Sequence, residues 1–191
     1  EISACLVGSE MCIRDSSNLI DCTFMAQNNQ PINMQDFVHL HVHTQYSLLD
    51  GQASVARLVD KAMKNGMKGI AVTDHGNMFG IKEFTNYVNK KNSGPKGEIK
   101  DLKKRLVGIE AGSIECEDKE AEVAACKAKI VEAENKLFKP IIGCEMYVAR
   151  RTMDLKEGKQ DQSGYHLIVL AKNETGYHNL IKLVSHAWTR G

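Results

Sequence analysis

The sequence predicts an α/β fold that is interrupted by an inserted helical hairpin. Three short apolar runs, over residues 69–73, 140–149 and 165–171, have the length and composition of buried strands. Amphipathic segments of helical period lie between or after them, and this strand and helix order is typical of α/β domains. The block 96–136 departs from the pattern, because 19 of its 41 residues are charged.

The segment 37–51, FVHLHVHTQYSLLDG, carries the strongest chemical signal. We interpret it as a strand that runs into a loop, so that alternation places His39, His41 and His43 on one face. Histidines spaced i, i+2 lie about 6 to 7 Å apart at Cα and can converge on one metal ion or on two neighbouring ions. A single histidine here would more simply be a half-exposed polar residue. Three on one face, with Asp50 on the following loop, favour a metal site.

The composition bounds the class of protein. Charge is nearly balanced, with 25 basic and 24 acidic residues, and gives no indication for or against nucleic acid. No apolar run approaches the roughly 18 to 20 residues of a membrane span, so we expect no membrane partner. The six cysteines form no CxxC pair and no secretory signal is present, which favours reduced thiols in a cytoplasmic protein.

The first 33 residues have neither a helical period nor strand alternation. We interpret residues 1–33 as a disordered or non-native tail, because CLVGSEMCIRDS resembles a translated sequencing adapter. Met25 or Met34 would then be the true start, and residues 34–191 would form a partial domain. The alternative is a helix over residues 3–11 that packs on the domain.

Two helices are expected around the strand at 69–73. The first, over residues 54–64, has Ser54 as its N-cap and Gly66 just beyond its end. The second, over residues 78–91, has a looser face that includes Phe79, Tyr87 and Val88. Between them, the strand ends in Asp74 and His75, as expected for an α/β strand that delivers polar residues at its C-terminal end.

The charged block predicts a helical hairpin inserted at residues 94–138. Apolar residues recur there with spacings of three and four in both halves, which indicates a narrow seam between two helices, and we expect no catalytic role. After it, the strand at 140–149 carries Glu145, and Cys144 should point to the opposite face. The strand at 165–171 has His166 near its start, and Asn173 should cap a last helix over residues 174–189.

Metal-competent residues therefore follow or lie within successive strands. They are His41, His43, Asp50, His75, Glu145 and His166. In α/β barrels such residues gather at one rim, and imidazole with carboxylate suits Zn²⁺, Mn²⁺ or Mg²⁺. Two or three divalent ions in one pocket suit hydrolysis of a phosphate ester, since one lowers the pKa of a bound water and another stabilises the leaving oxygen.

Four segments carry a resemblance to a known family: HVHTQYSLLDG, AVTDHGNMFG, KPIIGCEMYVA and YHLIVLAKNETGYHNLIKL. In this order they resemble the PHP (polymerase and histidinol phosphatase) domain at the N-terminus of bacterial DNA polymerase III alpha subunits. An HxH pair alone is weak evidence for this family, because amidohydrolases share it, whereas the four segments together are a specific signal. The resemblance covers residues 35–191 apart from the hairpin, and implies a partial, distorted (β/α)7 barrel.

The resemblance also implies roles for single residues. The family's metal ligands are matched by His41, His43, Asp50, His75, Glu145 and His166. Asp74 precedes the second-motif histidine, and we expect it to orient His75 or a metal-bound water. His39 lies outside the matched set and is expected to be packed or to support the ligands. The family's remaining ligands and the polymerase palm would follow Gly191, so we expect a fragment with an exposed apolar edge and weak or no activity.

Three functions remain open from the sequence. The leading one is a module of the DNA polymerase III alpha subunit, in which a metal-dependent phosphoesterase acts as a 3′→5′ proofreading exonuclease while the parent synthesises DNA. DNA and other replicative holoenzyme subunits would be its partners, and this assignment rests on the resemblance. The alternatives are a free-standing phosphatase that acts on a small phosphomonoester, and a structural or docking domain without activity.

Overall fold

The computed structural model describes residues 3–4, 37–162 and 164–191. Its sheet has the order β1-β4-β3-β2, formed by Ser3–Ala4, Tyr165–Leu170, Lys139–Val148 and Gly69–Val72. Strands β2 and β3 are parallel, whereas β4 runs antiparallel to β3. The predicted tail lies outside the described residues, except for the two residues of β1.

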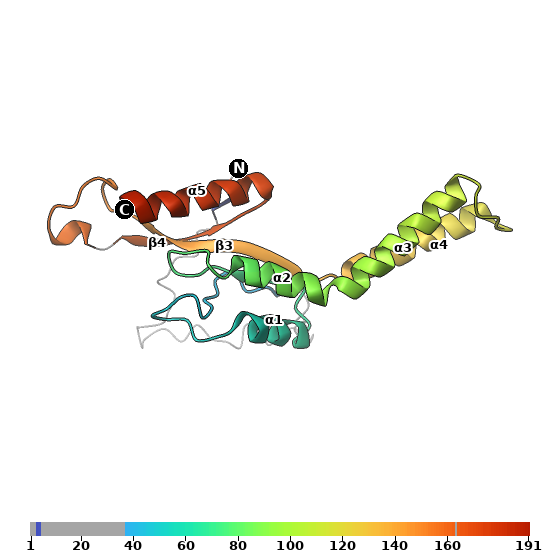
Figure 1. Cartoon of the computed structure of the whole chain (residues 1–191), viewed down its shortest axis with the longest axis horizontal. Helices are drawn as coiled ribbons and strands as arrows, with labels where there is room; N and C mark the ends of the chain where they lie inside the picture. Colours follow the sequence, from blue (N-terminus) through green and yellow to red (C-terminus); the bar gives the residue numbers. More distant parts are fainter. Residues whose placement is uncertain (1–2, 5–36, 163) are drawn as a thin grey trace, which may run out of the picture.

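Five α-helices accompany the sheet in the described part of the chain. They are α1 (Val55–Lys64), α2 (Ile81–Lys91), α3 (Ser93–Glu110), α4 (Lys119–Asn135) and α5 (Glu174–Arg190), with a 3₁₀ turn, η3 (Lys159–Asp161), before β4. The α/β prediction is therefore confirmed. The described strands form an open, mixed sheet, which is consistent with a partial domain but does not close a barrel (Figure 1).

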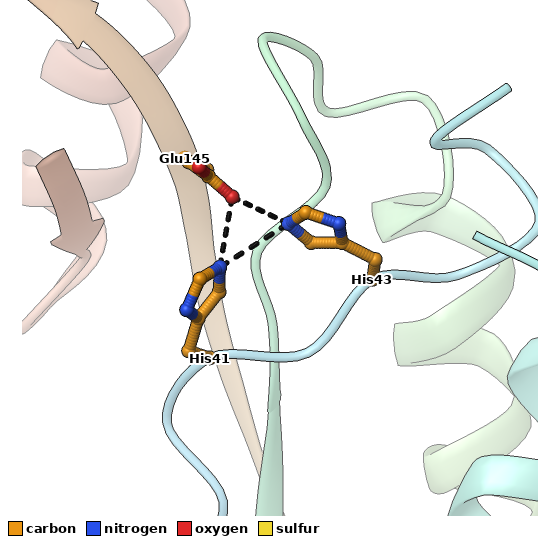
Figure 2. A group of neighbouring side chains, drawn as sticks. All are labelled: His41, His43 and Glu145. Atoms are coloured by element: carbon orange, nitrogen blue, oxygen red, sulfur yellow. Dashed lines mark hydrogen bonds and ion pairs between the residues drawn. The ribbon is translucent and has the colours of Figure 1, made fainter. Parts of the chain in front are cut away.

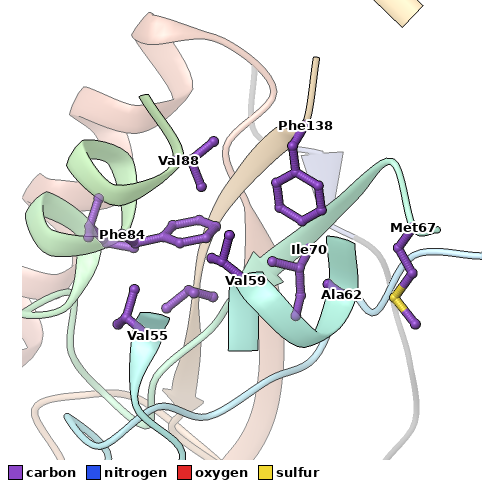
Figure 3. Close-up of a cluster of buried hydrophobic side chains, with 10 residues drawn as sticks. Val55, Val59, Ala62, Met67, Ile70, Phe84, Val88 and Phe138 are labelled. Atoms are coloured by element: carbon purple, nitrogen blue, oxygen red, sulfur yellow. The ribbon is translucent and has the colours of Figure 1, made fainter. Parts of the chain in front are cut away.

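The main core lies where α1 and α2 pack around β2 and the start of β3. Val55 and Val59 of α1 meet Phe84 and Val88 of α2, and Phe138 closes the cluster beside β3 (Figure 3). These side chains are almost wholly withdrawn from solvent. Burial of each contributes roughly 1.5 to 3 kcal/mol of transfer free energy, so this cluster stabilises the packing of α1 and α2 on the sheet.

The termini of α1 agree with the sequence prediction. The Ser54 side chain accepts a hydrogen bond from the Arg57 amide, and Gly66 has a φ of 76° just beyond the helix. The start of α2 was predicted wrongly, whereas Tyr87 and Val88 of its predicted face do pack in or against the core. Asn77 Oδ1 accepts a hydrogen bond from the Phe79 amide, so the chain first makes a turn and α2 begins only at Ile81.

This later start changes which side chains of α2 are buried. Ile81, Phe84 and Val88 face the core, while Phe79 precedes the helix and is exposed. On α5 the predicted Asn173 cap is confirmed, since its side chain accepts from the Gly176 amide at 2.9 Å. Three large apolar side chains of α5, those of Ile181, Leu183 and Trp188, remain exposed.

The predicted strand at residues 37–43 is not a regular strand. The segment lies beside β2, with the Ala71 amide donating to His39 O and the Thr73 amide donating to Val42 O, both at 2.9 Å. The Val42 amide, however, donates to the Thr73 hydroxyl at 2.8 Å instead of to a backbone carbonyl. This side-chain bond replaces a rung of the ladder and explains why strand pairing does not continue.

The hairpin of α3 and α4 projects away from the rest of the molecule, as Figure 1 shows. Its predicted seam is confirmed by the buried contacts of Ile99 with Ile130 and Ala133. The buried side chain of Asn92 closes its base, because Asn92 Nδ2 donates to Phe138 O at 2.8 Å and Asn92 Oδ1 accepts from the Phe138 amide at 3.0 Å. One amide side chain thus pairs the chain entering the hairpin with the chain leaving it.

Within the described residues, no helix has both the length and the apolar character needed to cross a membrane.

We predict that Asn92→Ala weakens the base of the hairpin. The substitution leaves the Phe138 amide and carbonyl without their partners, which costs about 1 to 3 kcal/mol for each buried group that stays unsatisfied. The free energy of unfolding in urea measures the loss. Asn89→Ala is the matched control, because exposed Asn89 only accepts a hydrogen bond from Lys96. Equal stability of the two variants would contradict the role of Asn92.

Candidate metal centre

Backbone pairing brings three distant segments together at the carboxyl end of β2. Beyond β2, His75 forms an isolated parallel bridge with Glu145, with the Gly76 amide donating to Glu145 O at 2.8 Å. On the other side, the Thr73 amide donates to Val42 O. Residues 39–43, 73–76 and 143–147 consequently lie side by side, and their polar side chains share one rim.

The most compact group on this rim consists of His41, His43 and Glu145 (Figure 2). Glu145 Oε2 lies 2.8 Å from His41 Nε2 and 2.5 Å from His43 Nε2, and the two nitrogens are 3.2 Å apart. Ligand atoms on a tetrahedral ion with bonds of 2.0 to 2.1 Å are about 3.3 Å apart, and those on an octahedral ion of the same bond length about 2.9 Å apart. Two edges of the triangle, 2.8 and 3.2 Å, are close to these spacings, and the third, 2.5 Å, is shorter. The three donor atoms thus converge closely enough to hold one ion.

Two further groups share residues with the first. Asp50 Oδ2 lies 3.2 Å from His43 Nδ1 and 2.9 Å from His75 Nδ1. His166 Nδ1 contacts Glu145 Oε1, and with His75 these two residues form the third group. His166 reaches the rim because β4 is antiparallel to β3, so that the start of β4 lies at the end of β3. The structure thus brings together all six residues that the sequence predicts as metal ligands.

One buried nitrogen of the site favours bound cations independently of these distances. His75 Nε2 is buried and has no hydrogen-bond partner among the residues that the structure describes. A buried polar atom without a partner costs about 1 to 3 kcal/mol, and coordination of an ion by this nitrogen would remove that cost. The imidazole and carboxylate donors fit Zn²⁺, Mn²⁺ or Mg²⁺, and the three groups could hold two or three such ions.

The carboxylates of the site are held in the charged form. Burial alone would raise the pKa of Glu145, whose side chain is only 4% exposed, but hydrogen bonds from His41 and His43 outweigh burial and hold that pKa below its usual value. The hydrogen bond with His75 is the main cause that lowers the pKa of Asp50. Both groups are therefore anionic at neutral pH, the state in which a carboxylate binds a cation.

Asp74 lies behind the rim and is fully buried. Its carboxylate accepts hydrogen bonds from the Thr44 amide at 2.6 Å, from the Thr44 hydroxyl at 2.8 Å, and from the Ser47 hydroxyl at 2.8 Å. The expected contact with the His75 imidazole is not among its interactions with described residues. Asp74 instead reaches His75 through Ser47, whose Oγ accepts from the His75 amide at 3.0 Å.

We call Thr44, Ser47 and Asp74 the buried latch. It connects the loop that carries Asp50 to the backbone of His75. Gly80 leaves room for it, because a Cβ there would lie 2.8 Å from the Tyr46 ring and 3.2 Å from Asp74 Oδ2. The sequence analysis did not single out Thr44 or Ser47, although two hydroxyl residues beside a histidine motif are the kind of donors that a buried carboxylate requires.

Two further predictions concern residues outside the ligand groups. Cys144 is buried against Val169 and Leu180, on the opposite side of β3 from Glu145, as predicted. Burial raises the pKa of Cys144 to about 12, so it is a thiol at neutral pH, and its place on this side of β3 separates it from the three donor groups. His39 is exposed, and its ring makes a T-shaped contact with that of Phe37, so the expectation that it is packed was wrong, while a supporting role toward the ligands stays a prediction.

Tyr147 borders the centre and was missed by the sequence analysis. Its ring stacks on His75 and meets His166 edge to face. Burial is the main cause that raises the pKa of Tyr147, and the charges of Glu145 and Asp50 act in the same direction. The signal that could have found it is its position two residues after Glu145, on the same face of an alternating strand.

Comparison with known proteins agrees with this geometry. The family model described as PHP domain matches residues 39–191. The chain is 39% identical over 158 residues to the DNA polymerase III subunit alpha of Borreliella burgdorferi, and 40% identical over 156 residues to that of Treponema pallidum. It is 32% identical over 163 residues to the corresponding protein of Aquifex aeolicus. These matches cover 81 to 82% of this chain but only 10% of each relative, so the chain spans about a tenth of their length.

We predict that Ser47→Ala lowers the affinity for Mn²⁺ or Zn²⁺ by about tenfold to a hundredfold, as expected when a residue that positions ligands is removed. Calorimetric titration of the metal-free chain measures the affinity. Thr85→Ala is the control, because Thr85 donates within α2, to Ile81 O. An unchanged affinity in Ser47→Ala would show that the buried latch does not position the ligands.

Proposed function

This chain belongs to the PHP domain family, and we propose that its rim cluster is a divalent-metal centre that hydrolyses phosphate esters. The observation that carries the proposal is the sharing of Glu145. Its Oε2 meets His41 and His43 while its Oε1 meets His166, so one carboxylate connects two donor groups. The buried, unpartnered Nε2 of His75 gives independent support.

When bound, divalent ions in such a centre act as Lewis acids toward a phosphoryl oxygen and lower the pKa of a coordinated water. The imidazoles would hold the ions with Glu145 between them, and the buried latch would keep Asp50 and His75 in place. Exposure differs across the centre: the Glu145 side chain is almost buried, whereas those of His41 and His166 are 42% and 37% exposed. A phosphate group would approach from this open side.

For the longer protein we propose the role that its relatives' names suggest. Those relatives are named DNA polymerase III subunit alpha, which supports a parent protein that synthesises DNA and works with DNA and other replicative subunits. In that setting, the centre would remove mispaired nucleotides as a 3′→5′ exonuclease. Relatives of this name also support the polymerase module over a free-standing phosphatase.

We predict that the double variant His41→Ala/His43→Ala loses metal and hydrolytic activity together, because it removes two of the three donors in the most compact group. The expected loss of metal affinity is at least about a hundredfold. Metal content of the 191-residue chain is measured by elemental mass spectrometry. Hydrolysis is measured in the full-length protein, on single-stranded DNA, on a mispaired 3′ end and on p-nitrophenyl phosphate.

The matched control is His178→Ala/His186→Ala, which removes two exposed imidazoles of α5. Hydrolysis of the mispaired end by wild type, lost only in the first double variant, supports the exonuclease. Hydrolysis of the monoester alone would favour a phosphatase. Metal binding without hydrolysis of any substrate would leave a structural or docking domain.

A further inference from the structure

Tyr147 occupies a place on the rim that none of the proposed ligands fills. It lies two residues after Glu145 on β3, and it is directly opposite His166 in the antiparallel register with β4. Side chains two apart on a strand, and directly opposite across a pair, share one face of the sheet. Tyr147 therefore lies on the same face as the metal centre.

The ring of Tyr147 is held between two of the proposed ligands. Its centroid is 4.9 Å from that of His75, with an interplanar angle of 27°, and 4.8 Å from that of His166, with an angle of 83°. Gly76 lies beside the ring, at a position where a Cβ would be in ordinary contact with it at 3.6 Å. Aromatic contacts of these two kinds fix the ring plane, so the phenol has a defined position at the edge of the centre.

The hydroxyl of Tyr147 is available to a ligand. The residue is 55% exposed, and no residue that the structure describes accepts a hydrogen bond from its hydroxyl. By contrast, Tyr46 donates to Glu83 at 2.7 Å and Tyr87 donates to Asp60 at 2.9 Å. The tyrosine beside the metal centre thus keeps its donor free, while these two tyrosines, away from the centre, have theirs occupied.

The other hydroxyl groups beside the rim are already used. Thr44 and Ser47 donate to Asp74, and the proposed ligands offer nitrogen and oxygen lone pairs toward the centre. A phosphate oxygen is an acceptor and needs donors besides the ions. We infer that Tyr147 is a substrate-binding residue whose hydroxyl donates a hydrogen bond to the phosphate group of the ester. This inference rests on the proposed function, because it assumes that a phosphate is bound at the centre.

The test compares Tyr147→Phe with Tyr165→Phe in the Mn²⁺-loaded chain, with inorganic phosphate as the probe. Phenylalanine keeps the ring contacts with His75 and His166 and removes only the hydroxyl. Tyr165 is a matched control, because it is exposed and lies opposite Val148, so it points to the other face of the sheet. Calorimetry measures phosphate affinity, and elemental mass spectrometry measures bound Mn²⁺.

We expect Tyr147→Phe to weaken phosphate binding by about tenfold to a hundredfold, the usual range for one hydrogen bond to a charged group, with Mn²⁺ content unchanged. Tyr165→Phe should bind phosphate like wild type. Equal phosphate affinity in all three proteins, loss of Mn²⁺ from Tyr147→Phe, or no phosphate binding by wild type would each overturn the inference. If the chain binds phosphate through Tyr147 but the full-length protein hydrolyses no ester, the proposed function fails and the binding role of Tyr147 stands.

Discussion

The structure depends on one buried carboxylate, that of Glu145, which receives imidazoles from two other segments of the chain. A carboxylate on a core strand is costly unless it is paired. His41 and His43 arrive from the segment beside β2, and His166 arrives from the antiparallel strand β4. Each of these segments must pack correctly for the pairing to form. The pairing of Glu145 with these histidines and the order of the sheet therefore depend on each other. Bound cations would stabilise the buried carboxylate further.

The surrounding framework holds β2 and β3 side by side although the inserted hairpin lies between them in the sequence. The inserted hairpin separates β2 from β3 in sequence, but loop length adds little to the entropy of closure, and Asn92 joins its two ends through both groups of its amide. Behind the rim, Asp74 performs a similar task with hydroxyl donors from Thr44 and Ser47. Asn92 fixes the chain just before β3, at the far end of the sheet from the centre, whereas Asp74 fixes the loop that carries Asp50 to the backbone of His75.

Much of this arrangement could be predicted from the sequence, because hydrophobic period and cap residues are local signals. They identified α1, the seam of the hairpin and the strand that carries Glu145. Other features depend on contacts between segments that are far apart in the sequence. The Thr73 hydroxyl interrupts strand pairing at Val42, and Ser47 stands between Asp74 and His75. The direction of β4 and the stacking of Tyr147 on His75 likewise follow from pairing across the sheet, which periodicity in one segment does not encode.

The central claim is that the rim of β2 and β3 is a metal centre built from imidazole and carboxylate. X-ray absorption spectroscopy of the Zn²⁺- or Mn²⁺-loaded chain tests it most directly. The account predicts nitrogen and oxygen neighbours at about 2.0 to 2.2 Å, outer-shell scattering from imidazole rings, and a metal neighbour about 3.5 to 4 Å away when more than one ion is bound. Sulfur at about 2.3 Å, or a spectrum without imidazole scattering, would contradict it.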